Sequence, residues 1–129
     1  MKTLTIKTHA QTSMIDITDA LNAYIKERNV KDGVLYCFVP HTTAALTINE
    51  NADPTVQEDM LYGFDKIAPD DPAFRHLEGN SAAHIKASLV GASETILIEN
   101  GQLCLGVWQG VYFCEFDGPR TRQCLIKIV

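Results

Sequence analysis

Apolar and polar positions alternate at the start of the chain, where Leu4 and Ile6 are separated by threonine. Alternation with a period of two predicts a half-buried strand, and a second short strand is expected over residues 10–14. Beyond these strands the apolar residues recur at helical spacing. This change of period predicts an amphipathic helix over residues 17–29, with Asp16 as its N-cap.

The middle of the chain combines two extended segments with a helix. The run VLYCFVP, residues 34–40, is apolar at successive positions and predicts a central strand buried on both faces. Residues 44–49 form the second extended segment. Asp53 followed by Pro54 indicates a helix start, because aspartate caps free N–H groups and proline is tolerated in the first turn. One apolar face of this helix is predicted to comprise Val56, Met60, Phe64 and Ile67.

The C-terminal half predicts a loop, a short helix and several strands. Residues 68–80 contain two prolines and lack periodicity, so they indicate a loop. A helix capped by Asn80 or Ser81 is expected to end at Gly91. Its buried side is predicted to comprise Ala82, Ile85, Leu89 and Val90. Strands are expected over residues 95–98, 103–117 and 124–129. Because strands gather at the end of the chain, we predict a single α+β domain over residues 1–129, with about three helices, rather than a parallel βαβ array.

Charge and composition narrow the possible partners. The net charge is -5, and no cluster of lysine and arginine is longer than a pair. We therefore expect no nucleic-acid partner and no docking on a membrane, since both need a basic surface. The N-terminus has no apolar run of signal-peptide length, and the four cysteines form no C-x-x-C pair. Buried free thiols in a reducing, cytoplasmic compartment are the prediction.

The first candidate site lies between His41 and Pro54. His41 stands where the predicted buried strand ends, next to two threonines. If the segment is extended, Asn49 and Asp53 share one face with the asparagine between them. Three polar side chains beside a buried strand are costly unless they meet a partner or a ligand. Helix capping and turn formation are the alternative roles for these residues.

The second candidate site surrounds the start of the predicted helix after Gly79. A helix N-terminus offers free N–H groups and a positive dipole end to a phosphate or carboxylate. His84 lies at the edge of the apolar stripe of this helix. It is a candidate catalytic residue, and a structural histidine is the alternative.

The third candidate site lies within residues 105–122. Gln109 and Glu115 are polar residues in an apolar run, and Arg120 and Arg122 alternate on one face of an extended chain. Paired guanidinium groups are suited to phosphate. An edge strand with solvent-facing charge is the alternative, and it is favoured for Arg122. Apolar residues around 107–113 are expected to be exposed and to form an oligomer contact.

Three long segments together resemble the secondary thiamine-phosphate synthase (YjbQ-like) family: HTTAALTINENADP, AHIKASLVG and GQLCLGVWQGVYFCEFDGPRTR. The resemblance runs from about residue 30 to the C-terminus. It implies a compact mixed α/β sandwich with mainly antiparallel strands that assembles as a homotrimer. It also implies an activity that joins a pyrimidine diphosphate to a thiazole phosphate and releases pyrophosphate.

The same resemblance implies the residues of the site. The implied catalytic residues are His41, Asn49, Asp53 and His84, and the implied substrate-binding residues are Thr42, Thr43, Gln109, Glu115 and Arg120. Some relatives look able to hold a divalent metal, which would be Mg or Zn, and His41 and His84 are the candidate ligands. Thr43 stands where serine is frequent in the family, and this change keeps the hydroxyl group.

Three functional hypotheses follow from the sequence. The first is an enzyme that acts on a small phosphorylated or anionic substrate, with His41 or His84 as general acid or base. The second is a non-catalytic module that binds a small anion or metabolite in the same pocket. The third is a metal-dependent hydrolase with the two histidines as ligands.

Overall fold

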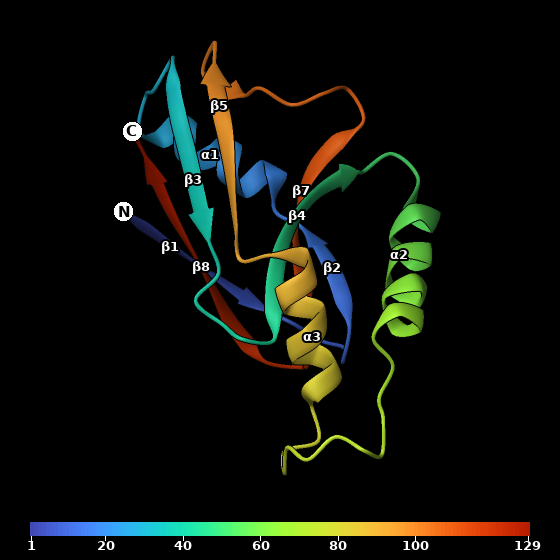
Figure 1. Ribbon diagram of the computed structural model, residues 1–129. Helices are drawn as coiled ribbons and strands as arrows, with labels where there is room; N and C mark the ends of the chain where they lie inside the picture. Colours follow the sequence, from blue (N-terminus) through green and yellow to red (C-terminus); the bar gives the residue numbers. More distant parts are fainter.

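The chain forms two antiparallel β-sheets and three helices, as a computed structural model of residues 1–129 shows (Figure 1). The strands of the larger sheet are, in order, β1 (Lys2–Lys7), β8 (Thr121–Ile128), β3 (Gly33–Phe38), β5 (Ser93–Glu99) and β6 (Gln102–Leu103). The smaller sheet has the order β2 (Ser13–Asp16), β7 (Gln109–Glu115) and β4 (Ala44–Glu50). The helices are α1 (Thr18–Glu27), α2 (Pro54–Ile67) and α3 (Ser81–Val90). The predicted α+β class, the antiparallel pairing and the three helices are confirmed.

The main core lies between the two sheets and α1. It combines alternate residues of the larger sheet, such as Leu35 and Ile126, with Leu46 and Phe113 of the smaller sheet. Helix α1 adds three buried side chains, which are Leu21, Tyr24 and Ile25. Because strand residues alternate between faces, this core takes only one face of each sheet.

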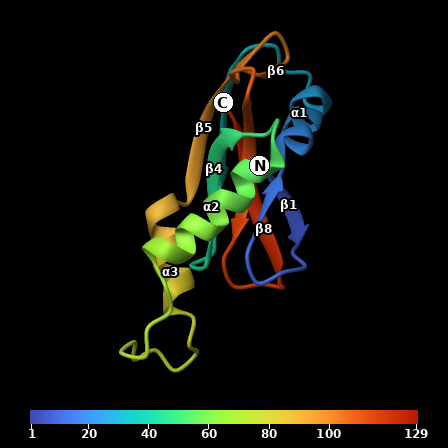
Figure 2. The ribbon, with the colours of Figure 1, turned by 90° about the vertical axis from the view of Figure 1, so that its right-hand side faces the viewer.

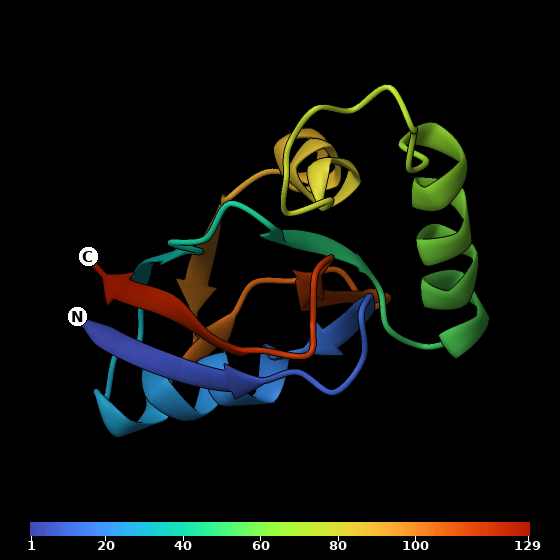
Figure 3. The ribbon, with the colours of Figure 1, turned by 90° about the horizontal axis from the view of Figure 1, so that it is seen from below.

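A second apolar cluster covers the other face of the smaller sheet. Ala45, Tyr112 and Cys114 of that sheet pack against Ala83 and Ala87 of α3. Figure 3 shows α2 and α3 on one side of the sheets and α1 on the opposite side. The smaller sheet is therefore buried on both faces, which explains why six of the seven residues of β7 are buried.

Strand β3 differs from its prediction. It is central in the larger sheet, as expected, but it is buried on one face only. Tyr36 and Phe38 are each 47% exposed, whereas Leu35 and Cys37 lie in the core. The larger sheet carries no helix on its outer face, so the apolar run reflects an open apolar surface rather than burial on both sides.

Helix α3 also differs from its prediction, because its small residues face the sheet. Ala83, Lys86 and Ala87 are buried, whereas Ile85 and Leu89 are exposed. The small alanine side chains allow the helix backbone to approach β4 closely. This close packing decides which face is buried, although Ile85 and Leu89 on the other face are larger and more apolar. The predicted stop at Gly91 is confirmed, and this residue has a φ of 106°.

Several local predictions can be compared directly with the structure. Asp53 caps α2 by accepting a hydrogen bond from the Thr55 N–H, with Pro54 in the first turn, as predicted. The N-cap of α1 is Ile17 rather than Asp16, although the Asp16 carboxylate accepts from the Thr18 N–H at 2.9 Å. All four cysteines are free, and Cys104 alone is exposed. No helix has the length and hydrophobicity that crossing a bilayer requires.

The expected oligomer patch at residues 107–113 is only partly exposed. Val107 and Trp108 are open to solvent, but Val111 and Phe113 are fully buried in the main core. The expectation of a continuous apolar surface there is wrong, because β7 is the middle strand of a sheet covered on both faces.

Candidate functional site

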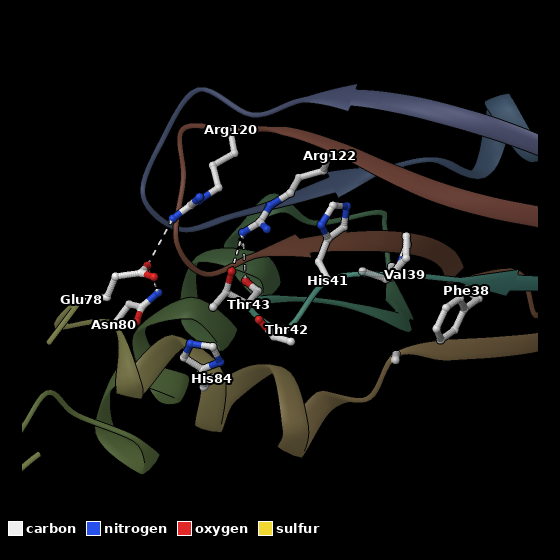
Figure 4. Close-up of a pocket in the computed structure, with 12 residues that line it drawn as sticks. Phe38, Val39, His41, Thr42, Thr43, Glu78, Asn80, His84, Arg120 and Arg122 are labelled. Carbon is white, nitrogen blue, oxygen red and sulfur yellow. Dashed lines mark hydrogen bonds and ion pairs between the residues drawn. The ribbon is translucent and has the colours of Figure 1, made fainter. Parts of the chain in front are cut away.

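A pocket of about 540 Å³ opens where three separate segments meet (Figure 4). The first is the connection between β3 and β4, which carries His41, Thr42 and Thr43. The second is the start of α3 with the residues before it, and the third is the turn that leads into β8. The twelve lining residues are Phe38, Val39, Pro40, His41, Thr42, Thr43, Glu78, Asn80, His84, Ala92, Arg120 and Arg122.

The connection between β3 and β4 crosses from one sheet to the other, and backbone hydrogen bonds at both of its ends hold it in place. Pro40 lacks an N–H group and follows the end of β3. The Val39 N–H donates to the Ala92 carbonyl at 2.8 Å, and the Phe116 N–H donates to the Thr43 carbonyl at 3.1 Å. These backbone contacts hold the His41 segment at the rim of the pocket.

The turn before β8 is equally constrained. The Gly118 N–H donates to the Gln11 carbonyl at 2.9 Å. A Cβ atom on Gly118 would lie 2.3 Å from the Ala10 carbonyl oxygen, so only glycine fits here without displacement. The close packing of this turn sets the position of Arg120 at the pocket.

Arg122 and Glu115 form a buried ion pair beneath the pocket. Arg122 is 4% exposed and Glu115 is 0% exposed. The Arg122 guanidinium donates to Glu115 from Nη2 at 2.5 Å and from Nε at 2.9 Å, and Nη2 also donates to Thr43 Oγ1 at 2.7 Å. The Thr8 hydroxyl donates to the same carboxylate at 2.7 Å.

The protonation state of Glu115 follows from these contacts. Burial alone would raise the pKa of Glu115, but hydrogen bonds from Arg122, Thr8 and the Asp117 N–H, together with the Arg122 charge, outweigh burial and place the pKa below its ordinary value. Glu115 therefore stays charged and orients Arg122. Glu115 does not line the pocket. It therefore positions Arg122, and the expected role in substrate binding is not the one that its location allows.

Arg120 is held from one edge by Asp117. Its Nε donates to the Asp117 carbonyl at 2.8 Å, and its Nη2 donates to Asp117 Oδ2 at 2.9 Å. The same Nη2 lies 3.9 Å from Glu78 Oε2. In both Arg120 and Arg122 the hydrogen bonds to the protein use Nε and Nη2, so the Nη1 group of each guanidinium remains available to a ligand.

His41 is held in one tautomer by the backbone. Its Nε2 accepts a hydrogen bond from the Gln123 N–H at 2.9 Å, so the proton of the neutral ring lies on Nδ1. Partial burial lowers the pKa of His41 below its ordinary value, and the nearby Arg122 charge acts in the same direction. Protonation of the ring would also place an N–H group on Nε2, where it would point at the Gln123 N–H and leave two donors facing each other. His41 is therefore a neutral hydrogen-bond donor.

His84 lies across the pocket from His41 (Figure 4). Its ring packs edge to face with His76, with 5.6 Å between the ring centroids. A second hollow of about 430 Å³, lined again by His41, Thr42 and His84, continues along α3 as far as Gly91. His41 and His84, which are far apart in the sequence, thus line one pocket.

Three predicted site residues lie at the other end of the smaller sheet. Asn49 accepts from the Glu50 N–H at 2.8 Å, and Gln109 accepts from the Gly106 N–H at 2.8 Å through its side chain. The pairing of Ala44 with Glu115 lies near the pocket, whereas Glu50 pairs with Gln109 six residues farther along each strand. At about 3.4 Å per residue this separation is roughly 20 Å. Asn49, Asp53 and Gln109 therefore do not join His41 in the pocket.

Asp53 acts at the start of α2. Its carboxylate accepts from the Thr55 N–H and the Thr55 hydroxyl, and these hydrogen bonds lower the pKa of Asp53 below its ordinary value. The extended segment that would have aligned Asn49 with Asp53 ends at Glu50. The cap role considered for Asp53 is the one that the structure shows, whereas Asn49 lies within β4 and forms no turn.

Three residues that line the pocket were not among the predicted substrate-binding residues, and they are Arg122, Glu78 and Asn80. For Arg122 a solvent-facing position was favoured over a phosphate contact, and this expectation is wrong because Glu115 of β7 neutralises Arg122 inside the fold. Asn80 was considered only as a helix cap, and Glu78 was not among the predicted substrate-binding residues. The sequence signal that could have indicated the buried ion pair is Glu115 within an apolar run, followed by arginines at the alternate positions 120 and 122.

The donor set does not fit a metal centre. His41 and His84 line one pocket, but no group of three or more His, Cys, Asp or Glu side chains is placed to hold a metal ion. Two imidazoles without a third protein ligand fall short of the usual sites for zinc. We therefore derive no chemistry through a metal, and the hypothesis of metal-dependent hydrolysis loses its structural basis.

The chain was compared with known proteins by sequence and by structure. The family model described as "UPF0047 protein YjbQ-like" matches residues 2–129. The UPF0047 protein YugU of Bacillus subtilis (strain 168) is 55% identical, over 100% of this chain and 98% of that protein. A crystal structure of an uncharacterized protein of the YjbQ/UPF0047 family from Clostridium acetobutylicum has a TM-score of 0.97 and 51% identity, and each chain is covered completely. A conserved hypothetical protein from Thermus thermophilus has a TM-score of 0.93 and 42% identity, again over the full length of both chains.

Proposed function

Because the chain belongs to the YjbQ-like UPF0047 family and its arginines and histidines line one pocket, we propose that it binds a small phosphorylated or otherwise anionic substrate between Arg120, Arg122 and His41. The observation that carries this proposal is the pair of guanidinium groups. Each has one edge committed to a carboxylate and its Nη1 uncommitted, and both line the same pocket. Fixed, partly desolvated guanidinium groups are well suited to phosphate oxygens.

Acid–base chemistry is the second part of the proposal. His41 donates from Nδ1 in a fixed tautomer, and His84, on the opposite side of the pocket, accepts or delivers a proton. The resemblance seen in the sequence supports a thiamine-phosphate synthase activity. In that reaction the arginines would offset the charge of the departing diphosphate.

The anion site is tested by replacing Arg120 with methionine. Arg120 is largely exposed, so the fold is expected to persist, whereas affinity for inorganic phosphate is expected to fall about tenfold or more. The matched control is Arg28→Met at the C-terminal end of α1, which removes an equal charge outside the pocket. Phosphate affinities are measured by NMR titration. Equal affinities of the Arg120→Met and Arg28→Met proteins would contradict the assignment.

We also propose a homotrimer, which the family resemblance implied. The outer face of the larger sheet supports it, because Tyr36, Phe38 and Leu97 are exposed side by side on β3 and β5. Sedimentation should give three times the mass of one chain. The double change Tyr36→Ser and Leu97→Ser should release monomers, whereas Leu77→Ser in the exposed loop should not. A wild-type monomer at micromolar concentration would refute this assembly.

A cytoplasmic location completes the proposal. Cys37 and Cys114 are buried, and burial raises the pKa of each thiol to about 12, so both are unreactive as thiolates. Four free thiols are typical of a reducing compartment. Protein isolated from its own cells under acid quench should carry four unmodified thiols, and disulfide-linked protein in that sample would count against this location.

A further inference from the structure

The pocket carries an acidic side chain at its mouth. Glu78 belongs to residues 68–80, the long connection between α2 and α3 that extends below the sheets in Figures 1 and 2. Its Oε2 lies 3.9 Å from Arg120 Nη2 and accepts a hydrogen bond from Asn80 Nδ2 at 3.0 Å. Figure 4 shows this carboxylate facing Arg120 from the opposite wall of the pocket. A phosphate that reaches Arg120 therefore meets Glu78 as well.

The charges around the pocket do not favour a bare polyanion. Arg120 faces two carboxylates, those of Asp117 and Glu78, and Arg122 faces Glu115. Two guanidinium groups therefore stand beside three carboxylates. An anion at the arginines is repelled by Glu78 unless the ligand also brings a positive or hydrogen-bond-donating group to that carboxylate.

Asn80 adds a second acceptor on the same side. Its Nδ2 donates to both Glu78 Oε2 and Asp117 Oδ2, the latter at 2.8 Å, so its donor capacity is committed to the carboxylates. Its Oδ1 is buried and has no hydrogen-bond partner in the chain. A buried acceptor without a donor is costly, and a ligand or water N–H or O–H would remove that cost. The wall formed by Glu78 and Asn80 is thus rich in acceptors, and the opposite wall is rich in donors.

We infer that Glu78 is a specificity-determining residue, and that the pocket selects phosphate esters that also carry a positively charged nitrogen over phosphate alone. This inference rests on the proposed anion site and names the class of ligand for it. The phosphate contacts the free edges of Arg120 and Arg122, and the nitrogen contacts the Glu78 carboxylate.

The test compares two simple probes, inorganic phosphate and O-phosphoethanolamine, by NMR titration of the full chain. The wild-type protein is expected to bind O-phosphoethanolamine about fivefold more tightly than phosphate, which is the scale of a partly exposed ion pair. In Glu78→Gln this preference is expected to disappear, with phosphate binding more tightly than in the wild type. Glu58→Gln, on the exposed side of α2, makes the same charge change outside the pocket and should keep the wild-type preference.

The possible results distinguish the role of Glu78 from the existence of the anion site. A wild-type protein that binds both probes equally, or a Glu78→Gln protein that keeps the wild-type preference, would overturn the role of Glu78 and leave the anion site intact. Failure of the wild type to bind either probe would overturn the anion site and this inference together.

Discussion

Replacing Arg122 with methionine is expected to lower the free energy of unfolding by about 3–5 kcal/mol. Methionine fills a similar volume but leaves the Glu115 carboxylate, which is 0% exposed, without its charged partner. A buried charge that loses its partner costs far more than the intact pair contributes, because nothing replaces the lost solvation. Urea unfolding at neutral pH, followed by circular dichroism, measures the change.

Two controls separate the buried charge from general damage to the pocket. Arg120→Met removes an exposed arginine two residues away and is expected to change stability by less than about 1 kcal/mol. The double variant Arg122→Met with Glu115→Met removes both charges and should recover a large part of the loss. The recovery is incomplete because Thr8 and the Asp117 N–H lose their acceptor. If Arg122→Met is as stable as Arg120→Met, the buried pair does not have the assigned role.

For the proposed thiamine-phosphate synthase activity, replacing His84 with glutamine is expected to reduce turnover by a factor of about 10² to 10⁴, which is the usual contribution of a general acid or base. The assay couples a pyrimidine diphosphate to a thiazole phosphate and follows the release of pyrophosphate. His84 is half-buried and no side chain of the chain hydrogen-bonds to it, so the variant should fold normally. Phosphate affinity is expected to change little, because glutamine keeps a polar group at this position.

His41→Gln provides the matched comparison within the same pocket. Glutamine can donate a hydrogen bond but cannot titrate, so a neutral donor at this position is largely replaced. A smaller loss than in His84→Gln is therefore expected. Wild-type turnover in both variants would contradict acid–base catalysis by these histidines. Binding of phosphate by all proteins without turnover in any of them would favour the non-catalytic binding module.

Local sequence signals predicted those parts of the fold that depend on local interactions. The start of α2 at Asp53 and Pro54 depends on capping and on the fixed φ of proline, and both act within a few residues. The buried face of α3 was predicted wrongly, because close packing of Ala83 and Ala87 on β4 decides it. That contact joins residues far apart in the sequence, so helical periodicity alone gave the wrong face.

The candidate site, too, could be predicted only as far as local sequence signals reach. His41 was predicted because it stands where a buried strand ends, and His84 because it lies at the edge of a helical apolar stripe. The structure brings both to one pocket. Asn49 was included because alternation placed it on one face with Asp53 and because the family resemblance implied it, but the length of β4 separates it from His41. A solvent-facing position was favoured for Arg122 because the sequence pattern does not show that Glu115, on a strand of the other sheet, pairs with it inside the fold.

The pocket between His41, Arg120 and Arg122 is expected to bind a phosphate group. A crystal structure of the wild-type protein grown in phosphate-free solution and then soaked with phosphate tests it most directly. We predict electron density for one phosphate within hydrogen-bond distance of the Nη1 groups of both arginines and of His41 Nδ1. An empty pocket at saturating phosphate, or phosphate bound only elsewhere on the surface, would show that these residues do not form a phosphate site.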